Sequence, residues 1–122
     1  MGSHPFNLAI RFLLEMTALI SFGMWAWNQG VGNLRYLYAF VFPVIFAAVW
    51  GVFAVPDDPS RSGTVPVIIP GFIRLILELS FFAFAAWTQY DLGNKKMSLV
   101  LAIIVVLHYI ISYDRLKWLL QQ

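Results

Sequence analysis

Four charged residues stand out because they lie inside long apolar stretches of the chain. Arg11 and Glu15 are four residues apart in one stretch, and Arg74 and Glu78 have the same spacing in a later one. A charge at the centre of a membrane costs from about 2.5 kcal/mol to far more, so such residues face protein or a water-filled cavity. In that setting a glutamate can take up protons, and a pair of arginines can hold an anion.

One histidine, His108, lies near the middle of a further apolar stretch. It either hydrogen-bonds to a neighbouring helix or completes a proton relay with Glu15 or Glu78. The candidate binding residues are therefore Arg11, Glu15, Arg74, Glu78 and His108. The charges also permit a second interpretation, because two positive and two negative side chains cancel, as a structural clasp between helices requires.

Other kinds of chemistry find no support in this sequence. The chain has no cysteine, which excludes thiolate nucleophiles and thiolate metal sites. It has two histidines, one of them in the N-terminal stretch, and it lacks H-E-x-x-H, G-x-S-x-G and phosphate-loop motifs. We therefore expect no metal and no cofactor, and catalysis is disfavoured, although a Glu–His acid/base pair stays open.

The composition indicates that lipid, not water, surrounds the chain. Of the 122 residues, 61% are hydrophobic and 11% are charged, and the mean hydropathy is +0.77. Soluble domains carry about 25% charged residues, and a small soluble fold could not hide this much apolar surface. The net charge of +2 comes from scattered basic residues, which gives no surface for nucleic acid. The expected partners are membrane lipid and, as a homodimer, a second copy of the chain.

Four stretches are long and apolar enough to cross the hydrocarbon core as helices. They cover residues 6–27, 36–55, 72–90 and 97–113, and residues 116–120 can extend the last. We expect an all-α integral membrane four-helix bundle that forms a single membrane domain over residues 1–122. Met1–His4 resembles a remnant of an expression tag, so we leave it out of the fold.

The second half of the chain repeats the first. Residues 10–15 read I-R-F-L-L-E and residues 73–78 read I-R-L-I-L-E, an offset of 63 positions that also pairs Gly30 with Gly93. We interpret this as two parallel copies of a helical hairpin, about 6–55 and 71–120, joined by a polar, proline-rich connection over 56–70. The repeat predicts that Arg11 pairs with Glu78 and that Arg74 pairs with Glu15.

Four crossings place both termini on one side of a cell membrane, and the basic residues weakly favour the cytoplasm for that side. Asp114, near the same interface, is expected to cap a helix or to pair with a basic neighbour. The basic residues on the side of the termini are Arg61, Arg115 and Lys117, with Arg11 and Arg74 nearer to it, against Arg35, Lys95 and Lys96 on the other.

Four segments are informative when taken together: L-A-I-R-F-L-L-E-M at 8–16, W-A-W at 25–27, W-G-x-F-x-x-P at 50–56 and F-I-R-L-I-L-E-L at 72–79. They resemble segments of the YrdB family of small four-span bacterial membrane proteins, a domain of unknown function. The resemblance covers nearly the whole chain and implies a bacterial inner-membrane location, with no functional residue to carry over. Small multidrug exporters are similar in having a glutamate where Glu15 lies, but Arg11 and the second Arg–Glu pair depart from their pattern.

Three functions stay open on the sequence alone. The first is a transporter or small-molecule binder that uses the central Arg/Glu cluster. The second is a structural or accessory membrane protein that binds a partner or a lipid, with the cluster as an interhelical clasp. The third and least favoured is a membrane-embedded enzyme that uses Glu15, Glu78 or His108. A wet cavity that reaches the glutamates favours the first function, and a dry Arg–Glu lattice favours the second.

Overall fold

The computed structural model describes residues 5–56, 58 and 64–122 and is all-α, as predicted. Met1–His4 and Arg61 lie outside the described residues. Two strands of two residues each, β1 (Phe53–Ala54) and β2 (Val67–Ile68), pair in parallel with Phe53 opposite Val67. The helices are α1 (Pro5–Gln29), α2 (Leu34–Val52), α3 (Gly71–Asp91), α4 (Lys95–Ile111) and α5 (Tyr113–Leu120).

Helices α1, α2 and α3 are each long and apolar enough to cross a membrane. Helices α4 and α5 meet that test only as a pair, and they are bent by 71° at the break between them. The described residues therefore contain three candidate spans, or four if the pair is one span. The expected continuation of the fourth span through Leu120 is therefore interrupted at Ser112. The bend brings α5 back against the start of α3, where Arg115 meets acidic partners described below.

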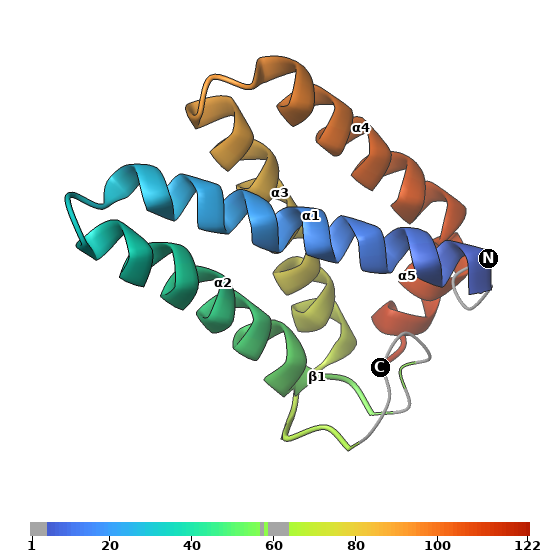
Figure 1. Ribbon diagram of the computed structural model, residues 1–122. Coiled ribbons are helices and arrows are strands. Elements are labelled where there is room, and N and C mark those ends of the chain that lie inside the picture. The colour runs from blue at the N-terminus through green and yellow to red at the C-terminus, as the bar shows by residue number, and fades with distance from the viewer. Residues whose placement is uncertain (1–4, 57, 59–63) are drawn as a thin grey trace.

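The two hairpins, α1–α2 and α3–α4, pack together through α1 and α3, which cross near the centre of the molecule (Figure 1). Phe22 of α1 stacks on Phe46 of α2 at 4.3 Å between ring centroids and meets Phe81 of α3 edge-on at 5.1 Å. Fully buried Ala18 and Ala85 keep the crossing close. By contrast α2, all of whose residues are described, contains no buried residue and lies at the outside. The parallel repeat itself stays a prediction.

The repeat suggests that the α1–α2 turn and the α3–α4 turn use equivalent glycines, but the structure shows that they do not. The left-handed residues are Gly32, with φ +60°, and Gly93, with φ +88°, and glycine adopts this conformation without steric cost. Gly30, which the offset pairs with Gly93, serves another purpose. A Cβ atom there would lie 2.4 Å from the Cα atom of Arg35, so Gly30 lets the chain double back tightly.

Gly71→Ala is expected to lower the free energy of unfolding by about 1–3 kcal/mol, the usual cost of overpacking. The added Cβ atom would lie 1.6 Å from the carbonyl oxygen of Leu119, so the backbone of α5 has to move. Thermal unfolding in detergent measures the loss. Gly51→Ala is the matched control, because a Cβ atom there meets nothing within 4 Å. Equal losses in the two variants would contradict the close packing of α5 on α3.

Candidate functional site

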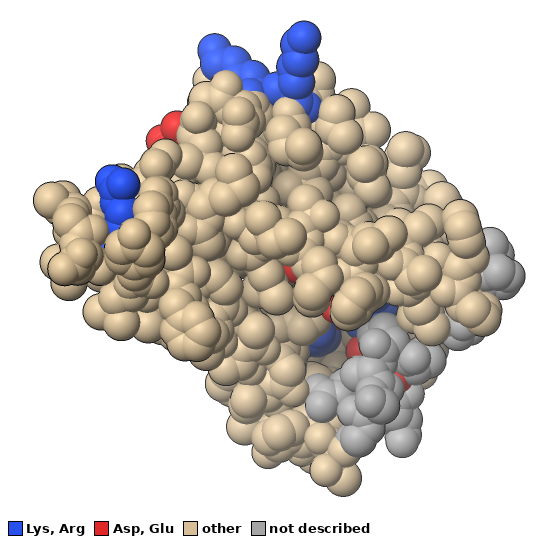
Figure 2. Space-filling model, in the orientation of Figure 1, with Lys and Arg blue, Asp and Glu red and all other residues tan. Residues whose placement is uncertain are grey.

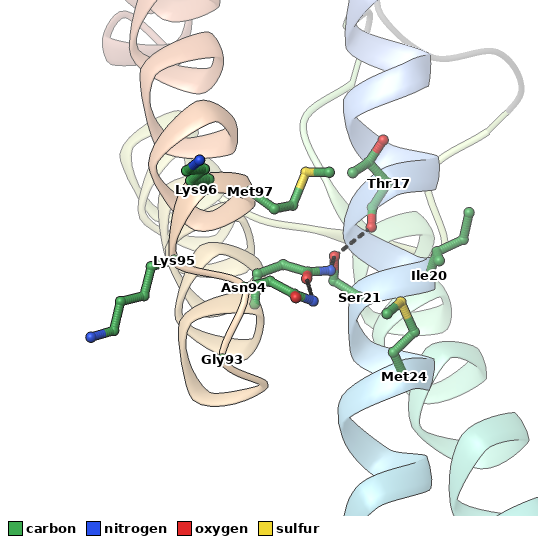
Figure 3. A pocket seen from close by; sticks show the side chains of 10 residues that line it. Thr17, Ile20, Ser21, Met24, Gly93, Asn94, Lys95, Lys96 and Met97 are labelled. Carbon is green, nitrogen blue, oxygen red and sulfur yellow. Dashed lines mark hydrogen bonds between the residues drawn. The ribbon is translucent and has the colours of Figure 1, made fainter.

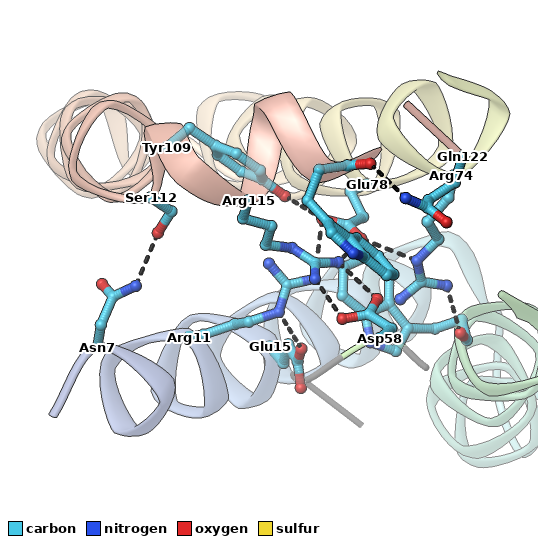
Figure 4. Close-up of polar contacts among 12 residues, drawn as sticks. Asn7, Arg11, Glu15, Asp58, Arg74, Glu78, Tyr109, Ser112, Arg115 and Gln122 are labelled. Carbon is cyan, nitrogen blue, oxygen red and sulfur yellow. Dashed lines mark hydrogen bonds and ion pairs between the residues drawn. The ribbon is translucent and has the colours of Figure 1, made fainter. Parts of the chain in front are cut away.

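Six charged side chains gather at the end of the molecule where α1 begins and α5 ends (Figure 4). They come from α1, α3, α5 and the segment between β1 and β2, which are far apart in the sequence. Three are cations and three are anions, so their formal charges cancel. We call this group the charged cluster: Arg11, Glu15, Asp58, Arg74, Glu78 and Arg115.

Glu78 is the centre of the charged cluster and is 0% exposed. Its Oε1 atom lies 2.8 Å from Arg11 Nη2 and accepts a 2.8 Å hydrogen bond from Tyr109 Oη. Its Oε2 atom accepts from Arg74 Nε at 2.8 Å and from Arg115 Nη2 at 2.7 Å. A carboxylate offers about four lone-pair positions; three hydrogen bonds and the ion pair with Arg11 surround both oxygens of Glu78.

Arg74 joins α3 to the end of α2. Its Nη1 atom donates to the carbonyl oxygens of Trp50, at 2.6 Å, and Phe53, at 2.7 Å. The last carbonyls of a helix have no partner within it, so a cation there satisfies them and also interacts favourably with the helix dipole. The guanidinium also lies over the Trp50 ring, 4.4 Å from its centroid. A single side chain of the second hairpin thus caps a helix of the first.

Arg115 and Asp58 form a bidentate ion pair that sequence reasoning missed. Both guanidinium Nη atoms of Arg115 donate to the Asp58 carboxylate, one of them at 2.9 Å, and both side chains are buried. Asp58 belongs to the polar connection, to which no role in the site was assigned, and Arg115 was considered only as one possible partner of Asp114. The structure instead places Arg115 between Asp58 and Glu78, with α5 turned inward to bring it there.

One of the two ion pairs predicted from the repeat is confirmed and the other differs. Arg11 pairs with Glu78, as expected. Arg74, expected to pair with Glu15, donates instead to Glu78 on its own helix, because its other nitrogen is held by the end of α2. Glu15 lies at the edge of the charged cluster, where its side chain is 21% exposed and 3.3 Å from Arg11 Nε.

His108 is buried beside the charged cluster but does not complete a relay by direct hydrogen bonds. Neither of its ring nitrogens has a hydrogen-bond partner among the described residues. The next residue, Tyr109, is the one that donates to Glu78. Nearby, Asn7 Nδ2 donates to Ser112 Oγ at 2.7 Å and ties the start of α1 to the break between α4 and α5. Within the described ranges no group of three or more potential ligand side chains could hold a metal ion.

A separate hollow of about 810 Å³ lies between α1 and the beginning of α4, toward the end with the two short turns (Figure 3). We call it the α1–α4 hollow. Its lining includes Thr17, Ser21, Gln89 and Met97, and it includes none of the six residues of the charged cluster. The charged cluster and this hollow are therefore different places.

Comparisons with known proteins support the sequence-based resemblance. A family model described as protein of unknown function (DUF2568) matches residues 9–106. The uncharacterized protein YrdB of Bacillus subtilis (strain 168) is 47% identical over 116 residues, which is 95% of this chain and 94% of that protein. No solved structure matches the chain. The resemblance to YrdB is thus confirmed, and the chain belongs to the DUF2568 family.

Proposed function

We propose that this protein is an accessory membrane protein that binds a membrane component, and that its charged cluster is a structural clasp between the two hairpins. The observation that carries the proposal is the state of Glu78. It is fully buried and its two oxygens meet three arginines and a tyrosine. A carboxylate in this position stabilises the contact of α1, α3 and α5, and protein groups rather than a substrate surround both of its oxygens.

The distribution of apolar side chains supports a location in the membrane. Large apolar residues such as Phe40, which is 70% exposed, cover the outer faces of the helices. Soluble monomers rarely expose apolar patches above a few hundred Å². The face shown in Figure 2 is mostly uncharged, and lysine and arginine side chains project at the end with the short turns. We place the chain in the cell membrane with four crossings, counting α4 and α5 as one, and with both termini on the cytoplasmic side.

A transporter remains the competing function, and Glu15 is the residue that distinguishes it. Intramembrane acids often mark ion pathways, and Glu15 is the partly exposed acid of the charged cluster. In proteoliposomes with a pH-sensitive dye inside, we expect an imposed pH gradient to decay as slowly as in protein-free vesicles. Glu15→Gln should leave that rate unchanged. A proton flux that Glu15→Gln abolishes, with its melting temperature unchanged, would overturn the accessory role.

A further inference from the structure

The α1–α4 hollow exists because α1 and α4 touch at one end and separate toward the other (Figure 1). They are tied together where Asn7 bonds to Ser112 and where Arg11 and Tyr109 share Glu78. Near the short turns no hydrogen bond or ion pair joins α1 directly to α4 among the described residues that line the hollow, where Gln89 of α3 bonds to Ser21 of α1 instead. Helices α1 and α4 are therefore held together directly at one end, and the hollow lies between them at the other.

The lining of the hollow is amphipathic. A chain of hydrogen bonds forms its polar part: Asn94 Nδ2 donates to Gln89 Oε1 at 3.1 Å, Gln89 Nε2 donates to Ser21 Oγ at 2.8 Å, and Ser21 Oγ donates to the Thr17 carbonyl at 2.8 Å. The rest is mainly apolar and exposed, with Ile20 and Met24 on α1 and Met97 on α4 (Figure 3). A suitable occupant has a polar group joined to a long apolar part.

The position of the hollow along α1 corresponds to the depth at which a membrane lipid would lie. Thr17, Ile20, Ser21 and Met24 are spaced as one helix face, and they span about 10 Å at 1.5 Å per residue. Since α1 ends at Gln29, this face runs from near the membrane surface into a hydrocarbon core about 30 Å thick. A volume of about 810 Å³ is in the usual range for a ligand site.

Two lysines at the opening of the α1–α4 hollow favour an occupant whose polar group is negatively charged. Lys95 and Lys96 are exposed and line the hollow at the membrane surface. The nearest acid in sequence, Asp91, accepts a 2.8 Å hydrogen bond from Trp25 Nε1 and is not part of the lining. In Figure 3 Lys96 stands beside Met97, whereas the exposed Lys95 side chain extends away from the hollow, with its Nζ atom 5.7 Å from the centroid of the Tyr90 ring. Two lysines above an apolar cleft suit a phosphate with an attached acyl chain.

We propose that the α1–α4 hollow binds one anionic phospholipid, with its phosphate at Lys95 and Lys96 and an acyl chain between α1 and α4. This inference rests on the proposed accessory role and names the membrane component that it binds. The polar groups of Ser21, Gln89 and Asn94 lie below the phosphate, where the glycerol and ester oxygens of the lipid belong. A zwitterionic lipid lacks the net negative charge that the two lysines attract.

The test measures lipid binding to the purified full chain by native mass spectrometry, with phosphatidylglycerol and phosphatidylcholine of identical acyl chains as probes. We expect phosphatidylglycerol to bind at least tenfold more tightly. Lys95→Gln/Lys96→Gln should lose about fivefold in affinity for each lysine, the effect of one basic residue near an anionic headgroup. The control Arg35→Gln/Lys117→Gln removes the same charge away from the hollow and should change affinity less than twofold.

A second variant tests the apolar part of the site. Thr17→Phe narrows the hollow without changing charge and should reduce phosphatidylglycerol binding at least fivefold, whereas inorganic phosphate at millimolar concentration should not displace the lipid. Equal affinity for the two lipids, equal losses in the lysine pair and its control, or displacement by phosphate would each overturn the lipid site. None of these results bears on the proposed accessory role, whose failure would appear instead as a proton flux that Glu15→Gln abolishes without a change in melting temperature.

Discussion

Glu78→Gln is expected to lower the free energy of unfolding by about 3–5 kcal/mol, the cost of leaving buried charges without their partner. Three arginines, Arg11, Arg74 and Arg115, share this carboxylate. The amide keeps the shape but removes the negative charge, and its NH₂ group faces cationic donors. Thermal unfolding in detergent, followed by tryptophan fluorescence, measures the loss and includes a local probe, because Trp50 lies against both Arg11 and Arg74.

The matched control for that variant is Glu15→Gln, the same chemical change one hairpin away. The Glu15 side chain is 21% exposed and has one longer ion pair, at 3.3 Å from Arg11. Partly exposed pairs are worth about 1 kcal/mol or less, so this variant should remain nearly as stable as the wild type. A Glu15→Gln loss as large as that of Glu78→Gln would show that the clasp is not centred on Glu78.

Asp58→Asn and Arg115→Met are each expected to destabilise the protein by about 3–5 kcal/mol. Each substitution removes one side of the bidentate Arg115–Asp58 ion pair and leaves the other charge buried without that partner. The double variant should lose less than the sum of the two, with an interaction energy of about 0.5–3 kcal/mol. The reason is that the second substitution removes the charge that the first one stranded. A double-mutant cycle of unfolding free energies measures this coupling.

Lys117→Met is the control for the Arg115 variant, since it removes a cation from the same helix. Lys117 is exposed and lies over the Tyr113 ring, 4.7 Å from its centroid. Exposed substitutions of this kind usually change stability by less than about 0.5 kcal/mol. Strictly additive losses for Asp58→Asn and Arg115→Met would mean that the two side chains do not stabilise each other, and the bend at Ser112 would then need another cause.

The amino-acid sequence alone determined the all-α class of this protein and one ion pair of its charged cluster. Helical spans can be predicted from sequence because hydropathy is a local property: about 20 apolar residues in a row form a helix in lipid wherever the rest of the chain goes. The pairing of Arg11 with Glu78 was also predictable, because charges inside such spans are costly and must meet within the protein. The family resemblance followed from the same segments.

The tertiary structure decided which other groups reach that centre and where a hollow remains. Asp58 lies in a polar connection and Arg115 in a short helix after an apolar one, so neither has a periodic pattern that shows its direction. Their burial depends on the 71° bend between α4 and α5 and on how the connection folds back. Likewise Tyr109 rather than His108 meets Glu78 because of the rotation of α4 about its axis. These are contacts between distant segments, which local sequence does not specify.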